Sequence, residues 1–213
     1  MHIVSQNLKA GSYEKCMKIA RQEIQNKNLE NSMKTLKRAF MIHYGHSVDV
    51  SRYAHMIGKK YGASEKELEE LVLASLVHDI GKVNIPKTIL EKPGRLNEVE
   101  FKCIQGHTSI TKRILENAGM DEKIVDIAMH HHEKLNGTGY PHGLKGSQIS
   151  ELTQIVTVSD IYSALREQRA YKEGKTHEEA ISILRSDTQG VNQEFVSILN
   201  EVMVKRLKKA SGF

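Results

Sequence analysis

Histidines and aspartates recur along this chain at positions that helical periodicity turns inward. His46 shares a helical stripe with Val50 and Ile57, and His107 shares one with Ile104. Burying many titratable groups is strongly destabilising unless they are paired or bind a metal, so the fold must bring them together. The inward-facing set comprises His46, His78, Asp79, His107, His131, His132 and Asp160.

Taken singly, each of these histidines is more often a hydrogen-bonded core residue than a metal ligand. The set is different, because its five imidazoles and two carboxylates come from five separate predicted helices. One divalent ion accepts about four to six such ligands, so the set suggests two ions, with Asp79 as the bridging candidate. Imidazole and carboxylate ligands without thiolates favour iron or manganese, with zinc or nickel as alternatives, over magnesium or calcium.

The segments between these residues have helical periodicity and little β-branched alternation, which predicts an all-α fold. Gly45 is a candidate interruption of the first helix, and residues 83–95 are expected to form an ordered loop. His2 and His177 are expected to lie on the surface. The first two helices are expected at 32–61 and 64–81, the second with a Ser64–Glu67 capping box. A third is expected to begin at Asn97 with Glu100, a fourth to run from Asp121 to His132, and a fifth to carry Ile149 to Asp160. The last two are expected at 177–184 and 195–207.

The chain is predicted to hold one helical domain, residues 32–213, preceded by a short helical extension, residues 1–31. No apolar run approaches the ~18 residues of a membrane span and the N-terminus has no signal peptide, so a cytoplasmic protein is expected. Cys16 and Cys103 are then expected to be buried, reduced thiols. The net charge of +5 fits either a solvated helix surface or attraction of an anionic ligand, and it disfavours a cationic substrate.

Two adjacent ions suit attack on a phosphorus centre, because they activate a water and stabilise charge on the phosphoryl oxygens. Lys82, one turn beyond His78, could neutralise a phosphate, or could be an exposed lysine favoured by the helix dipole. The glycine-rich turn that follows His131 and His132 stops their helix.

The order of these motifs resembles the HD superfamily of metal-dependent phosphohydrolases, whose signature is a histidine, a His-Asp pair and a later aspartate. The finer pattern resembles the HD-GYP subgroup, over roughly residues 39–196. The residues that carry the likeness are His46, His78-Asp79-Ile80-Gly81-Lys82, His107, His131-His132-Glu133, Gly139-Tyr140-Pro141 and Asp160.

This resemblance implies an all-α domain that hydrolyses cyclic di-GMP to pGpG, or onward to GMP, with a metal-bridging hydroxide as nucleophile. It implies that the whole inward-facing set binds metal, often iron or manganese, with Asp79 and Lys82 as catalytic residues. A homodimer or a sensory or GGDEF protein is an expected partner, and DNA is not. The implied substrate contacts are Lys82, Gly139, Tyr140, Pro141, Arg169 and Lys172.

The sequence departs from the family pattern at four places. Ile42 stands where members with a third ion carry a glutamate, which predicts a binuclear site unless His43 substitutes for it. Ser163 replaces the usual aspartate one turn after Asp160, so turnover is expected to be slower or the substrate different. Asn136 replaces an aspartate before Gly137 and preserves the turn. Ala170 replaces a proline and leaves both neighbouring cations in place.

Two other functions are compatible with the sequence. The chain could be a non-catalytic cyclic di-GMP receptor, an interpretation that Ser163 favours and the intact ligand set disfavours. It could also be an HD phosphohydrolase for another cyclic dinucleotide or nucleotide. A substrate panel separates the second alternative from hydrolysis of cyclic di-GMP.

Overall fold

In the computed structural model the described residues are 29–168 and 173–210, with side chains described for 45–168 and 173–209. This part of the chain is helical and contains no β-strand beyond an isolated bridge between Asn136 and Lys145, which confirms the all-α prediction. The elements are α2 (Leu29–Tyr61), α3 (Glu65–Val77), η1 (Ile80–Asn84), α4 (Lys87–Leu90), α5 (Glu98–Gln105), α6 (His107–Asn117), α7 (Glu122–His130), η2 (Gly146–Gln148), α8 (Glu151–Arg166), α9 (His177–Ser186) and α10 (Gln193–Ala210).

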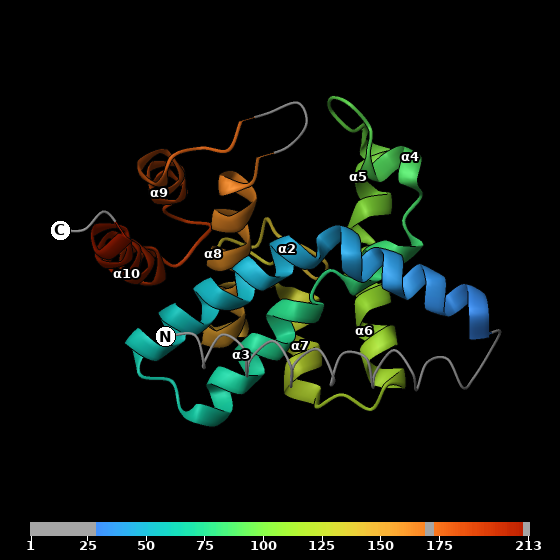
Figure 1. Ribbon diagram of the computed structural model, residues 1–213, viewed down its shortest axis with the longest axis horizontal. Coiled ribbons are helices and arrows are strands. Elements are labelled where there is room, and N and C mark those ends of the chain that lie inside the picture. The colour runs from blue at the N-terminus through green and yellow to red at the C-terminus, as the bar shows by residue number, and fades with distance from the viewer. Residues whose placement is uncertain (1–28, 169–172, 211–213) are drawn as a thin grey trace.

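The long helix α2 crosses the molecule and packs against α3 and α8 (Figure 1). Helix α7 lies between α3 and α6, and α9 and α10 close the far side beside α8. The apolar faces of these helices meet in one core, which includes Ile57 of α2, Leu71 of α3, Ile127 of α7, Tyr162 of α8 and Phe195 of α10. The histidines and aspartates of the predicted set extend from this core on the helices that build it.

Most helix boundaries follow from local signals that the sequence carries. Ser64 and Glu67 form the predicted capping box at the start of α3, and Asp121 caps α7. Gly62 ends α2 with φ +99°, a conformation that favours glycine. The predicted positions of the last two helices also agree closely with α9 and α10.

Other boundaries differ from the prediction. Helix α3 ends at Val77 rather than continuing to Gly81, so His78 caps it and Asp79 precedes the 3-10 turn η1. The helix expected from Asn97 breaks at Gly106 into α5 and α6, and the loop expected at 83–95 contains the short α4. Gly45 does not interrupt α2.

His177 is buried, and the prediction that it lies on the surface is wrong. Its Nδ1 lies 2.9 Å from the Tyr162 hydroxyl and its Nε2 lies 3.1 Å from the Asn200 side-chain oxygen. The ring therefore joins α8, α9 and α10. The sequence showed only a polar residue at a helix start, and it gave no sign of partners from two other helices.

Several expectations fall on residues outside the described part. They include the N-terminal extension up to residue 28, Cys16 and His2. Cys103 carries a free thiol, as expected, but is half-buried rather than buried, because α5 lies at the edge of the bundle. Among the described helices, none combines the length and the apolar character that a membrane crossing requires.

Candidate metal centre

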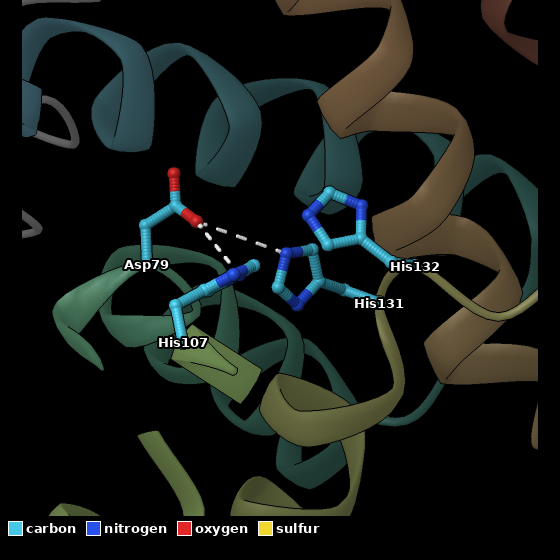
Figure 2. A group of neighbouring side chains, drawn as sticks. All are labelled: Asp79, His107, His131 and His132. Carbon is cyan, nitrogen blue, oxygen red and sulfur yellow. Dashed lines mark ion pairs between the residues drawn. The ribbon is translucent and has the colours of Figure 1, made fainter. Parts of the chain in front are cut away.

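The structure brings the whole predicted His/Asp set together at the centre of the helical bundle. His46 comes from α2, Asp160 from α8, and the other members come from the ends of α3, α6 and α7. Figure 2 shows Asp79 facing His107 and His131, with His132 beside them. Three overlapping groups have ligand atoms within 4.8 Å of one another, namely Asp79 with His107, His131 and His132, His46 with His78 and Asp79, and His78 with His131 and Asp160.

The set divides by exposure into two groups. We call His78, Asp79, His107 and His131 the inner group, since their side chains are only 0–3% exposed. We call His46, His132 and Asp160 the outer group, with side chains 9%, 24% and 11% exposed. Solvent and ligands therefore reach the site from the side of the outer group.

All three inner histidines are oriented by the same backbone contact. The Nδ1 of His78, His107 and His131 lies 2.7, 2.6 and 2.7 Å from the carbonyl oxygen of the residue three positions earlier. An Nδ1–H that donates to this carbonyl leaves Nε2 unprotonated in the neutral ring, and this is the arrangement in which a histidine binds metal. In this neutral form the three rings present lone pairs to one shared space.

The buried atoms of the inner group fit a bound cation. The Nε2 atoms of His78, His107 and His131 and the Oδ1 of Asp79 have no hydrogen-bond partner among the described residues. The His107 Nε2 to Asp79 Oδ1 distance is 3.4 Å. Two ligand atoms that each lie about 2.1 Å from one ion are themselves about 3.0–3.5 Å apart. The donor set therefore fits a metal site of the kind that binds transition metals through imidazole and carboxylate.

Both carboxylates divide their oxygens between two sets of histidines. Asp79 turns Oδ1 toward His107 and His131, at 3.4 and 3.8 Å, and Oδ2 toward His78, at 3.4 Å. Asp160 turns Oδ1 toward His46, at 2.9 Å, and Oδ2 toward His132, at 3.8 Å. One set is therefore His46 and His78, the other is His107, His131 and His132, and each carboxylate turns a different oxygen toward each set.

The outer group is oriented by side chains rather than by backbone. His46 contacts Asp160 through Nε2, and its Nδ1 lies 3.2 Å from the Ser163 hydroxyl. Ser163 is one of the four positions at which the sequence departs from the family pattern, and its hydroxyl occupies the place of an orienting acceptor. A hydroxyl is a weaker acceptor than a carboxylate, so His46 is oriented less strongly than an aspartate at this position would allow.

Burial lowers the pKa of most of the imidazoles in the site. It lowers the pKa of His107, lowers that of His131 well below its usual value, and lowers that of His132 to about 4. These rings are neutral at physiological pH. Neutral imidazole is the form that binds a metal ion.

Neighbouring charges outweigh the effect of burial on the pKa values of Asp79, Asp160 and His78. Burial alone would raise the pKa of Asp79, but Lys82 and His78 hold it well below its usual range. The pKa of Asp160 is held low by His46 and His78 in the same way. Burial lowers the pKa of His78, but Asp79 and Asp160 outweigh it and raise that pKa to about 10. The two charged carboxylates therefore favour positive charge between them, from a proton on His78 or from a cation.

Lys82 lies at the edge of the site, with its Nζ 2.5 Å from Asp79 Oδ2. Its side chain is 21% exposed. The lysine is therefore placed beside the carboxylate that joins the two sets of histidines. From this position its charge also reaches the open side of the centre.

A close backbone contact fixes Asp79 relative to α6. Gly81 follows Asp79 in η1, and a Cβ at this position would collide with the His107 carbonyl oxygen and with Thr111. The Thr111 hydroxyl accepts from the Gly81 N–H at 3.0 Å and donates to the His78 carbonyl at 3.0 Å. Glycine and threonine thus hold the His-Asp turn against the helix that begins with His107. The sequence gave no sign of this role for Thr111.

Glu133 organises the loop that follows the two adjacent histidines, a role that the sequence did not reveal. Its side chain is buried and accepts from three successive backbone N–H groups, those of His142, Gly143 and Leu144, at 2.6, 3.1 and 3.0 Å. A glutamate in a glycine-rich turn would ordinarily be solvated. The only sequence signal for this contact is that Glu133 precedes three consecutive loop residues by 9, 10 and 11 positions.

The same loop places Tyr140 over the outer side of the centre. A Cβ at Gly139 would collide with the backbone of residues 132–134, so only glycine allows the loop to pack this closely. The Tyr140 N–H donates to the His132 carbonyl at 3.2 Å, and its ring lies 4.7 Å from the His132 ring at an angle of 36°. Burial raises the pKa of Tyr140, which keeps its hydroxyl protonated.

Some predicted site residues cannot be placed. Arg169 and Lys172, expected to contact substrate phosphate, lie outside the described residues. The side chains of Ile42 and His43, on which the expectation of two rather than three ions depends, are also not described, although both positions fall within α2. Those expectations stay predictions.

Known proteins resemble this chain over most of its described length. A sequence profile of the HD domain matches residues 17–190. The chain is 38% identical over 143 residues to the 3′3′-cGAMP-specific phosphodiesterase 3 of Vibrio cholerae, covering 67% of this chain and 31% of that protein. It is 38% identical over 151 residues to a cyclic di-GMP phosphodiesterase of Pseudomonas aeruginosa, covering 70% of this chain and 36% of that protein.

A solved structure shares the fold. Bd1817, described as an HDG"Y"P protein from Bdellovibrio bacteriovorus, superposes with a TM-score of 0.62 at 23% sequence identity, covering 74% of this chain and 51% of that chain. The present chain spans only about a third of the length of the two curated relatives. Those relatives therefore contain further segments that the comparison does not describe.

Proposed function

Because the chain belongs to the HD domain family and is of its HD-GYP type, we propose that it is a metal-dependent phosphodiesterase that hydrolyses a cyclic dinucleotide. The observation that carries the proposal is the set of converging, unpartnered ligand atoms in the inner group. The relatives named as phosphodiesterases supply the substrate class.

We propose two divalent ions, iron or manganese first and zinc or nickel as alternatives. The oxygens of Asp79 and Asp160, divided between two sets of histidines, support a pair of neighbouring sites with these carboxylates between them. The proposed ligands are His46, His78, Asp79, His107, His131, His132 and Asp160. Two such ions would supply an activated water and stabilise charge on the phosphoryl oxygens.

The chain's own residues would bind and orient the substrate. Lys82 would place its charge beside a phosphoryl oxygen while remaining close to Asp79. Tyr140, packed on His132, would form one wall of the entrance, with Gly139 and Pro141 shaping the loop behind it. Arg169 and Lys172 are proposed as further phosphate contacts on the basis of the family motif alone. The product would be linear pGpG, or GMP after a second cleavage.

The relatives are divided between two substrates. The Pseudomonas aeruginosa relative is named for cyclic di-GMP and the Vibrio cholerae relative for 3′3′-cGAMP, at the same identity to this chain. We propose cyclic di-GMP as the substrate and 3′3′-cGAMP as the second candidate. Ser163, which orients His46 in place of the family aspartate, is the difference within the site that could alter rate or preference.

The test is hydrolysis by protein purified without oxygen and loaded separately with iron or manganese. Metal content per chain is measured first, and cyclic di-GMP and 3′3′-cGAMP are then followed by chromatography. Conversion of either substrate to its linear form is the expected result. A fully loaded protein that hydrolyses neither would overturn the proposal, and tight binding without hydrolysis would indicate a receptor instead.

The location and the partners of the chain stay predictions. A cytoplasmic location, a homodimer and a sensory or GGDEF partner are consistent with a signalling phosphodiesterase. A domain boundary at residues 31–32 is likewise a proposal, because most of the preceding segment lies outside the described residues.

A further inference from the structure

An exposed aromatic side chain lies beside the entrance to the metal centre, outside the hydrophobic core. Phe101 of α5 is 47% exposed. Its ring centroid lies 6.0 Å from that of Tyr140, at an angle of 82° between the rings. Exposing this much of a phenylalanine forfeits apolar burial, so a ligand that covers the ring would recover it.

The two rings continue inward toward the metal centre. Tyr140 lies 4.7 Å from the ring of His132 and 6.4 Å from that of His107. Phe101 is therefore separated from a proposed metal ligand by a single intervening aromatic ring. The ribose of a nucleotide similarly separates its base from its phosphate.

We propose that Phe101 stacks on a purine base of the substrate while the scissile phosphate lies at the metal centre. This inference rests on the proposed function. Two rings at nearly a right angle form a corner, in which a planar base can stack on one ring and meet the other edge to face. Base stacking on an aromatic side chain tolerates different bases, which is compatible with either candidate substrate.

The other large exposed apolar residue on α5 provides a matched control. Val99 is 78% exposed and lies two positions from Phe101, and therefore on a different face of the helix. Val99→Ala removes a more exposed apolar side chain from the same helix without changing the aromatic corner. A general effect of α5 surface hydrophobicity would appear in both variants, whereas stacking would appear only at Phe101.

Steady-state kinetics of the metal-loaded full chain test the proposal. Phe101→Ala is expected to raise KM for the cyclic dinucleotide on the order of tenfold, with kcat within about twofold of the parent, because stacking contributes to binding. Phe101→Tyr should restore KM and Phe101→Leu should not, since leucine is apolar but has no ring. Val99→Ala should leave both constants unchanged. An unchanged KM in Phe101→Ala would overturn the inference.

A binding measurement keeps this inference separate from the proposed function. A cyclic dinucleotide with one 2-aminopurine base loses fluorescence when that base stacks, and the signal needs no hydrolysis. The parent and Phe101→Tyr are expected to quench it, and Phe101→Ala to quench it far less. If the parent hydrolyses nothing but quenches through Phe101, the proposed activity fails and the stacking site stands. If the parent hydrolyses the substrate and Phe101→Ala quenches equally, only the stacking site fails.

Discussion

The inner and outer groups of the metal centre are built in different ways. The inner histidines each contact a main-chain carbonyl through Nδ1 and are fully buried. In the outer group, His46 contacts the side chains of Asp160 and Ser163. The difference shows that helix geometry orients the deep histidines, whereas individual side chains orient His46 on the more exposed side.

The largest loss of metal and activity is expected from substitution of Asp79, whose two oxygens face different histidines. Asp79→Ala removes both oxygens that face the histidines, so metal content should fall to near zero and activity by at least about a thousandfold, as expected when Lewis-acid stabilisation is lost. Elemental analysis and product chromatography measure the two losses. Asp126→Ala, an exposed aspartate on α7, serves as the control and should retain both. Retention of metal by Asp79→Ala would place the site elsewhere.

A smaller loss of activity is expected when the loop that carries Tyr140 loses its contacts with Glu133. Glu133→Ala leaves three backbone N–H groups without their acceptor, which should lower the free energy of unfolding by about 2–4 kcal/mol. Tyr140 would no longer be held on His132, so kcat/KM should fall at least about tenfold while metal content is unchanged. Chemical denaturation and kinetics test this. Glu133→Gln keeps an acceptor oxygen and should lose less, and an equal loss would contradict the role given to the loop.

Ser163 should affect the outer group alone. Ser163→Ala removes the hydroxyl beside His46 Nδ1 and is expected to weaken one of two metal-binding steps about tenfold, because such contacts orient ligands. Titration against a competing chelator separates the two steps. Ser163→Asp supplies a stronger acceptor and should strengthen the same step. Equal weakening of both steps would show that Ser163 does not act on one of the two proposed ion sites alone.

The smallest effect concerns the pH dependence of the metal-free protein. His132 has a pKa of about 4 in the folded state, while the unfolded chain binds this proton near pH 6.5. The unfolded state therefore holds more protons between these values, and stability should fall as pH decreases from 6.5 to 4. His107 and His131 act in the same direction, whereas His78, with a folded-state pKa of about 10, acts in the opposite direction near pH 6.5.

His132→Gln should reduce the slope of the unfolding free energy against pH by the contribution of one proton. Denaturation in the presence of a chelator at several pH values measures the slope. An unchanged slope would mean that His132 titrates alike in the folded and unfolded protein, and the lowered pKa of His132 would then be wrong.

The sequence predicted what periodicity and local signals determine. The inward-facing set followed from helical stripes, and the capping boxes at Ser64 and Asn97 followed from their spacing. What was missed depends on contacts between distant segments. His177 lies between Tyr162 and Asn200, Thr111 joins η1 to α6, and Phe101 meets Tyr140. Nothing in the neighbouring residues indicates such partners.

The break at Gly106 was missed for a related reason. His107 faces inward as predicted, but it does so at the start of a new helix rather than within a continuous one. An inward stripe is compatible with both arrangements, because it specifies the face on which a residue lies and not whether the backbone helix continues. Periodicity therefore predicted the direction of the side chain and not the course of the backbone.

The three carbonyl contacts of the inner histidines have an evolutionary consequence. The acceptors belong to the main chain of Ser75, Ile104 and Ala128, and every amino acid carries the same carbonyl. Substitutions at those positions that keep the helix therefore keep the contact, and the deep half of the centre is robust to mutation. The contact of His46 with Ser163 depends on one hydroxyl. A single codon change there removes the contact, so the orientation of the outer group is more easily altered by mutation than that of the inner group.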